Sequence, residues 1–138
     1  MGLDGGMSTA PAPRSATPVR VIPDDELQPG DPTPGMSRRV AGHEQGMWTG
    51  TVDTEPGAVS GWHHHGEHET TLYVVSGRMR LESGPDGQDV VEAGPGDFIR
   101  VPAGAVHRES NPSAEAARAV IVRCGTGAPT INVDGPAG

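Results

Sequence analysis

The sequence predicts an all-β fold of short antiparallel strands, arranged as a jelly roll or barrel. The 138 residues include 21 glycines and 14 prolines, and both residue types favour turns over long helices. From residue 36 onward, short β-prone segments alternate with turn residues at fairly regular spacing. No stretch keeps a 3.6-residue hydrophobic period over three turns, as an amphipathic helix would. Eight or more short strands in one small chain point to a closed or two-sheet β architecture.

The individual strands follow from β-prone segments bounded by turn signals. We expect them at 37–41, 47–53, 58–64, 70–76, 78–83, 89–92, 97–101, 105–109 and 117–124, with a last one at 130–133. The tripeptide Pro85-Asp86-Gly87 predicts a hairpin turn, because proline and glycine supply the restricted and positive φ values that such turns need.

The chain divides into three parts. Residues 1–18 are mostly small residues and proline without hydrophobic periodicity, which predicts a disordered N-terminal tail. Residues 19–35 read as a short strand, Val19–Ile22, followed by a linker rich in proline and glycine. Residues 36–134 then form a single β-barrel domain, since a chain of this length supports one core.

Composition excludes several classes of function. All ten basic residues are arginine, which rules out lysine Schiff-base chemistry. The net charge of −8 argues against nucleic acid and anionic membranes as partners, and no apolar run approaches the roughly 20 residues of a membrane span. The single cysteine, Cys124, together with an N-terminus that lacks an apolar signal segment, indicates a cytoplasmic protein. We expect Cys124 to be a buried structural thiol.

Two segments carry the chemistry of the chain. Residues 57–77 hold four of the six histidines within six residues, and residues 96–111 add His107. Side chains alternate between the faces of a strand, so His63 and His65 share one face while His64 lies on the other. Imidazole and carboxylate groups that converge from separate strands suit a transition metal. Taken alone, the histidine run also fits a solvated polar strand end.

The spacing within these segments follows two motifs. The second segment reads glycine, five residues, proline, one residue, glycine, two residues, histidine, three residues, asparagine, and its members are Gly96, Pro102, Gly104, His107 and Asn111. The first segment reads glycine, five residues, His-x-His, three residues, glutamate, seven residues, glycine, and its members are Gly57, His63, His65, Glu69 and Gly77. Both segments resemble the paired motifs of the cupin superfamily, over about residues 40 to 124.

The resemblance implies a small single-domain cupin, whose fold is a double-stranded β-helix or jelly-roll barrel with a metal inside one end. It implies a divalent transition metal held by His63, His65, Glu69 and His107, with Fe2+ first and Mn2+, Ni2+, Zn2+ or Cu2+ as alternatives. The turn at residues 102–104 would aim His107 into the cavity, because proline fixes φ and glycine accepts a positive one. Asn111 is expected to form a turn rather than take part in catalysis.

One spacing departs from the cupin pattern and leaves the carboxylate ligand open. The pattern has six residues between the glutamate and the closing glycine, whereas seven separate Glu69 from Gly77. Counted back from Gly77, the ligand position falls on Thr70, and a one-residue bulge could return Glu69 to the ligand face. Without that bulge, the site resembles the three-histidine variant of some cupin dioxygenases. His68 is a further possible ligand, although we expect it to face solvent.

The motifs favour a metal-dependent enzyme that acts on a small organic metabolite. Dioxygenase chemistry comes first, isomerase or decarboxylase chemistry second, and a non-catalytic ligand-binding or sensor module is the alternative. Glu69 and Tyr73 are the candidate catalytic residues, although a half-buried tyrosine at the edge of the core is the more common case for Tyr73. Arg100 and Arg108 flank the second motif and could meet an acidic substrate. We expect a homodimer, with residues 19–41 adding a strand to the partner's sheet edge.

Overall fold

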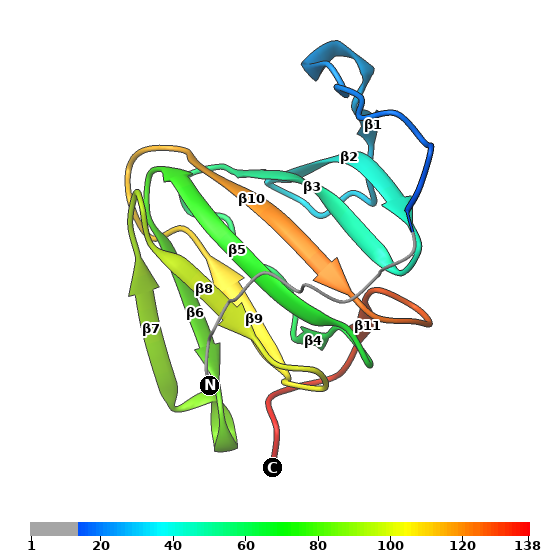
Figure 1. The fold of residues 1–138 in the computed structure, drawn as a ribbon. Coiled ribbons are helices and arrows are strands. Elements are labelled where there is room, and N and C mark those ends of the chain that lie inside the picture. The colour runs from blue at the N-terminus through cyan, green and yellow to red at the C-terminus, as the bar shows by residue number, and fades with distance from the viewer. Residues whose placement is uncertain (1–13) are drawn as a thin grey trace, which may run out of the picture.

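The protein folds into two antiparallel β-sheets that lie face to face (Figure 1). The structure is a computed structural model, and it describes residues 14–138. The six-stranded sheet has the order β1-β2-β3-β10-β5-β8, and the five-stranded sheet has the order β11-β4-β9-β6-β7. Among the described residues, no helix has the length and apolarity needed to cross a membrane.

The described part of the chain begins with three strands of the six-stranded sheet and then crosses repeatedly between the two sheets. Their bounds are β1 Gln28–Pro29, β2 Met36–Glu44, β3 Met47–Thr54, β4 His63–His64, β5 Glu69–Ser76, β6 Met79–Ser83, β7 Asp89–Ala93, β8 Phe98–Val101, β9 His107–Ser110, β10 Ala117–Cys124 and β11 Ile131–Asn132, with short 3-10 helices η1 Asp24–Glu26 and η2 Pro85–Gly87. The prediction of an all-β jelly roll is therefore confirmed, and nine of the ten strands expected from residue 37 onward agree with the observed ones to within three residues at each end.

Two expected strands differ from the structure. Only His63–His64 of the expected 58–64 strand is regular β-structure, and Val59 contributes an isolated bridge to Ser110. Residues 19–22 are not a strand, since Val19 is fully exposed and no ladder partner lies beside it among the described residues. The N-terminal β-structure lies instead at β1, which pairs with β2 of the same chain. Residues 1–13 of the expected disordered tail lie outside the described residues.

The core lies between the two sheets and is built by strict alternation. In β10 the residues Ala117, Ala119 and Ile121 point inward and are almost fully buried, while the residues between them are more exposed. The same pattern in the other strands adds Met36, Trp48, Val52, Leu72, Val74, Met79, Leu81, Ala93, Ile99 and Val101. Burial of apolar area at about 25 cal/mol per Å2 is the main stabilising contribution of this layer.

One end of the inner layer changes from apolar to polar. The inward series of β10 ends in Arg123 rather than in another aliphatic residue. The cross-strand partners of Arg123 are Trp48 in β3 and Thr70 in β5. The fold therefore places a charged and a polar side chain on the inner face at this end, which is where the histidines also lie.

Two glycines hold turns at opposite ends of the inner layer, Gly104 near the histidines and Gly77 at the far end of β5 beside Ala117. Gly104 has a φ of +74° in the turn in which the amide of Ala105 donates to the carbonyl of Pro102 at 3.1 Å, so the turn expected at residues 102–104 is confirmed. Gly77 has a φ of +76°, and a Cβ there would lie 2.5 Å from the carbonyl oxygen of Ala116. Only glycine fits such a position without strain.

Candidate metal centre

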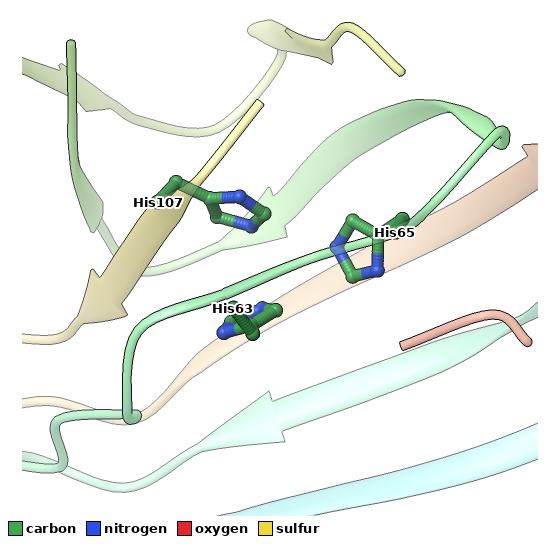
Figure 2. A group of neighbouring side chains, drawn as sticks. All are labelled: His63, His65 and His107. Carbon is green, nitrogen blue, oxygen red and sulfur yellow. The ribbon is translucent and has the colours of Figure 1, made fainter. Parts of the chain in front are cut away.

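Three histidines meet inside the barrel. His63 in β4 pairs directly with His107 in β9, and His65 follows β4 by one residue. The ring centroids lie 4.4 to 5.1 Å apart, and one ring nitrogen from each histidine lies within 4.8 Å of the others. All three side chains are buried and turn toward one another, as Figure 2 shows. The structure thus brings together the three histidines that the motifs singled out.

The hydrogen bonds of the rings define which nitrogens are free. Each Nδ1 lies against a backbone carbonyl oxygen, at 2.9 Å from Gly61 for His63, 2.8 Å from Pro129 for His65 and 2.9 Å from Ala105 for His107. A carbonyl only accepts, so each Nδ1 carries the proton and each Nε2 carries a lone pair. This is the arrangement of metal-binding histidines, in which the second nitrogen is fixed by a backbone or carboxylate acceptor.

The free nitrogens have the properties of unfilled ligand positions. Nε2 of His107 is fully buried and has no hydrogen-bond partner among the described residues. Burial lowers the pKa of His63. Burial, followed by the charge of Arg123, lowers the pKa of His65 to about 3. These two rings are therefore neutral at physiological pH, which is the state that binds a metal.

A buried carboxylate also reaches this cluster. Glu109 lies two residues after His107 and on the same face of β9, and its Oε2 is 3.7 Å from Nε2 of His107. Burial by itself raises the pKa of Glu109, but His107, His63 and Arg38 together lower it below its ordinary value. The carboxylate is ionised, so two electron-pair donors face each other. A separation of 3.7 Å is too long for a hydrogen bond but suits two ligands of one metal at about 2.0–2.2 Å each.

The structure does not bring Glu69 to this cluster. Glu69 is exposed, and its carboxylate accepts a hydrogen bond from the amide of Ala103 at 2.8 Å. β5 pairs with β10 residue by residue from Glu69 to Val74, so no bulge moves Glu69 to the inner face. The register shift in this pair lies at the far end, opposite Arg118. The assignment of Glu69 as metal ligand and catalytic residue is therefore corrected.

Thr70 occupies the inward position that the motif gives to the carboxylate. It is 1% exposed, and its Oγ1 has no partner among the described residues. Tyr73 lies three residues further along β5, on the opposite, outer face, where its ring packs against Phe98 at 5.0 Å between centroids. The catalytic role expected for Tyr73 is therefore also corrected, because its hydroxyl group is on the wrong side of the sheet.

Three further expectations concern histidine and cysteine positions. His64 is half-buried on the other face, where its Nδ1 accepts a hydrogen bond from the amide of Gly66. His68 is fully buried rather than solvent-facing, because the turn folds its Nδ1 back onto the carbonyl of His65. Cys124 is exposed rather than buried, since the alternation of β10 turns Arg123 inward and its neighbour outward.

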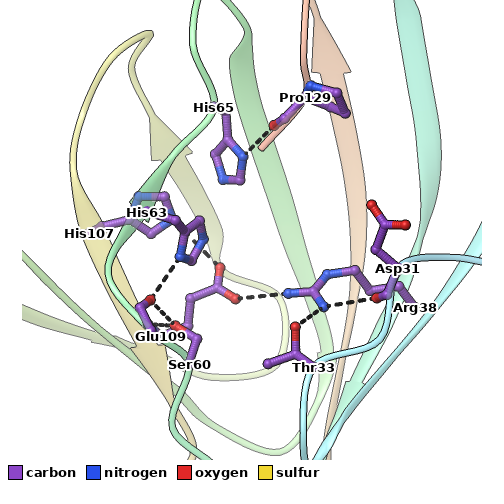
Figure 3. A network of polar contacts seen from close by, with 10 residues as sticks. Asp31, Thr33, Arg38, Ser60, His63, His65, His107, Glu109 and Pro129 are labelled. Carbon is purple, nitrogen blue, oxygen red and sulfur yellow. Dashed lines mark hydrogen bonds and ion pairs between the residues drawn. The ribbon is translucent and has the colours of Figure 1, made fainter. Parts of the chain in front are cut away.

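A cavity of about 560 Å3 opens from the cluster, and His63 lies in its wall. The charged side chains of its lining are Asp31, Arg38 and Arg123. Arg38 lies 4.0 Å from the carboxylate of Glu109 and donates to Thr33 Oγ1 at 2.8 Å, in the network of Figure 3. This polar network connects the cavity with the histidine cluster.

Sequence reasoning missed Glu109, Arg38 and Arg123, although a signal for each was present. Each of them is two residues away from an inward-facing residue of the same strand, and therefore points inward as well. These reference residues are His107 in β9, Met36 in β2 and Ile121 in β10. A charged residue in an inward-facing position of a predicted strand is a functional candidate in its own right.

Comparison with known proteins places this architecture in a family. Residues 50–123 match the cupin domain family, and the chain belongs to it. A search of curated protein sequences finds no match. Together with the two sheets and the single motif pair, the match defines a small single-domain cupin.

Solved structures of low sequence identity share the fold. KdgF from Halomonas sp. is 22% identical, with a TM-score of 0.64 over 79% of this chain and 96% of that one. A sugar phosphate isomerase of the cupin superfamily from Silicibacter pomeroyi is 23% identical, with a TM-score of 0.66 over 83% and 82%. Oxalate decarboxylase from Bacillus subtilis is 21% identical, with a TM-score of 0.67 over 79% of this chain but 30% of that longer chain. At these identities the likeness concerns the fold alone.

Proposed function

We propose that this protein is a metal-dependent enzyme that acts on a small organic metabolite. The observation that carries the proposal is the convergence of three buried imidazoles whose Nδ1 atoms are all bonded to backbone carbonyls. Structural zinc sites are usually closed by four ligands that include thiolates, whereas Cys124 is exposed on the outer face. A cavity of about 560 Å3 beside the cluster has the size of a small-molecule site.

The ligands that we assign are His63, His65 and His107, whose donor atoms lie within 4.8 Å of one another. Glu109, whose Oε2 lies 3.7 Å from Nε2 of His107, is the carboxylate that we place beside them instead of Glu69. All four side chains are buried and lie on the inner faces of β4, its extension and β9. Neutral imidazole and carboxylate suit Fe2+, our first choice, as well as Mn2+, Ni2+, Zn2+ and Cu2+. When bound, such a metal supplies Lewis acidity or, as Fe2+, activation of dioxygen. The chain's own contribution is orientation, because each Nδ1 hydrogen bond fixes a ring before binding.

We place oxidation by dioxygen first among the possible reactions. The three-histidine set, with no ligand at Glu69, resembles the variant found in some cupin dioxygenases. Isomerisation or decarboxylation is the second candidate, because the structural neighbours include a sugar phosphate isomerase and oxalate decarboxylase. The oxalate decarboxylase is described with Mn(II) centres. A non-catalytic ligand-binding module is the remaining alternative.

Anaerobic loading with Fe2+ and, in parallel, with Mn2+ or Zn2+ tests the proposal. We expect about one metal per chain, lost in His107→Ala and retained in His43→Ala, which changes an exposed histidine outside the site. Oxygen consumption is then measured with catechols, diketones, thiols and keto acids, and oxygen-independent conversion of the same compounds is followed by NMR. Full metal occupancy in His107→Ala would overturn the ligand set. A metal-loaded protein that binds compounds without converting any would favour the non-catalytic module.

A further inference from the structure

A buried and unpartnered positive charge lies in the cavity wall. Arg123 is 5% exposed and lines the cavity, yet its Nε has no hydrogen-bond partner and its guanidinium forms no ion pair among the described residues. Arginine keeps its charge at physiological pH, and an uncompensated buried charge destabilises a fold. A position of this kind is typical of a group whose partner is a bound ligand.

The guanidinium is held in a fixed orientation. Its Cζ lies 4.9 Å from the centre of the ring of Trp48, which is itself buried. Gly50 leaves room for the indole, since a Cβ there would lie 2.9 Å from the ring. Stacking on an aromatic ring occupies the face of the guanidinium and leaves its N–H edge available. That edge is the part that binds planar anions.

Within residues 14–138, one carboxylate and one further guanidinium lie near Arg123, and neither forms a hydrogen bond or ion pair with it. The nearby carboxylate, Glu109, lies beside Arg38 and His107. Burial lowers the pKa of Arg123 to about 10; among its charged neighbours, Glu109 raises the pKa and Arg38 lowers it. Two guanidiniums, those of Arg38 and Arg123, therefore face the cavity, and of these two only Arg123 has neither a hydrogen bond nor an ion pair among the described residues.

Arg100 and Arg108, which the sequence suggested for an acidic substrate, are not available for this role. Arg108 forms a two-pronged ion pair with Glu82 at 2.9 and 3.0 Å and stacks on Trp62. Arg100 is exposed, because it points outward from β8. The free guanidinium that faces the cavity is therefore that of Arg123.

We propose that Arg123, stacked on Trp48, anchors the carboxylate of a small organic anion whose remaining part extends to the metal centre. The N–H edge of a guanidinium matches the two oxygens of a carboxylate in spacing and charge. The inference rests on the proposed function for the role of the metal, but the anchor itself is a property of the cavity. The anchor at Arg123 defines the substrate class as carboxylic acids that are small enough to enter the cavity.

Arginine side-chain NMR of the 15N-labelled full chain tests the anchor. The probes are butanoate, its neutral counterpart butanamide, and inorganic phosphate, added to metal-free protein and to Zn2+-loaded protein. Arg123→Met identifies the Nε signal of Arg123. We expect this signal to shift saturably with butanoate and not with butanamide. We also expect butanoate affinity, followed at the indole signal of Trp48, to fall at least tenfold in Arg123→Met and in Arg123→Gln.

The matched control is Arg118→Met, which removes a charge from the outer face of the same strand, where Arg118 pairs with Asp53 at 2.7 Å. It should leave butanoate affinity unchanged, and thermal unfolding of all variants shows whether the fold is intact. An equal response to butanamide, or an unmoved Arg123 signal, would overturn the anchor. Tighter binding of phosphate than of butanoate would overturn the carboxylate assignment. If Zn2+ does not bind but the Arg123 signal still shifts with butanoate, the proposed metal-dependent enzyme is contradicted and the carboxylate anchor is not.

Discussion

Replacing His107 by leucine should change stability in opposite directions with and without metal. His107 is 2% exposed, and its Nε2 has no partner among the described residues. A buried unsatisfied acceptor costs about 1–3 kcal/mol. Leucine has nearly the same volume and removes that acceptor, while the lost hydrogen bond to Ala105 is worth about 1 kcal/mol. Without metal, His107→Leu should therefore lie between unchanged and about 2 kcal/mol more stable.

With metal bound, the wild type should be more stable than His107→Leu. A metal present at 100 times its dissociation constant stabilises the wild type by about 2.7 kcal/mol, and a variant with one imidazole fewer loses most of this. Urea unfolding in EDTA and in excess Zn2+ measures both quantities, and His43→Leu, at an exposed histidine, controls for histidine loss. The reasoning fails if His107→Leu is destabilised by several kcal/mol in EDTA, or if it gains as much from zinc as the wild type does.

Three further predictions follow from the same structure. Glu109→Gln should lower Zn2+ affinity about 10- to 100-fold, as is usual for groups that support a metal site. Equilibrium dialysis measures this affinity, and no change would show that Glu109 does not contribute to metal binding. Burial and Arg123 lower the pKa of His65 to about 3, so between about pH 3 and 6.5 the unfolded chain binds a proton that the native state does not. Metal-free protein should then lose stability as pH falls, by about 1.4 kcal/mol per unit, and a urea midpoint that is independent of pH would contradict this. We also expect a homodimer, but because Phe98 is 72% exposed beside Tyr73, we place its interface at β8 rather than at residues 19–41. Phe98→Glu should then give a monomer by light scattering, and a monomeric wild type would contradict the prediction.

The part of the site that depends on local geometry could be predicted from the sequence. His63 and His65 share a face because they are two residues apart, and the turn before His107 follows from Pro102 and Gly104. Neither inference needs knowledge of distant contacts. The structure accordingly brings these three histidines together and confirms the turn.

The carboxylate could not be assigned in the same way. Whether Glu69 or Thr70 faces inward depends on how β5 pairs with β10, about 50 residues away along the chain. A shift of one residue exchanges the two faces of a strand. The motif spacing alone therefore allowed both answers, whereas the observed pairing of Thr70 with Arg123 settles the face of each residue. Arg123 and Glu109 were predictable in principle, because each continues the inward parity of its own strand.

The cost of these buried groups argues for function rather than architecture. Each buried polar group without a partner costs about 1–3 kcal/mol, and the orphaned atoms include Oγ1 of Thr70, Nε2 of His107 and Nε of Arg123. A domain of this size has a total stability of about 5–15 kcal/mol. The opposite end of the same strands is mostly aliphatic, with Oγ1 of Thr54 as an unpartnered polar atom in the described part of the chain, so charged groups and imidazoles, rather than hydroxyls, distinguish the histidine end. Bound ligands are the natural source of the missing partners.

The metal and the organic anion should therefore bind cooperatively. The charge of Arg123 acts on His65 and, by the same field, opposes a cation held by that ring. A carboxylate that neutralises Arg123 removes this opposition, so butanoate should raise Zn2+ affinity, and Zn2+ should raise butanoate affinity by the same factor, because coupling between two sites is reciprocal. A factor in the usual range of about 5- to 150-fold is expected. In Arg123→Met the Zn2+ affinity should already be raised without butanoate and should no longer respond to it. Unequal factors in the two directions would show an error in measurement, whereas equal factors near one would show that the two sites are independent and that Arg123 does not serve the metal centre.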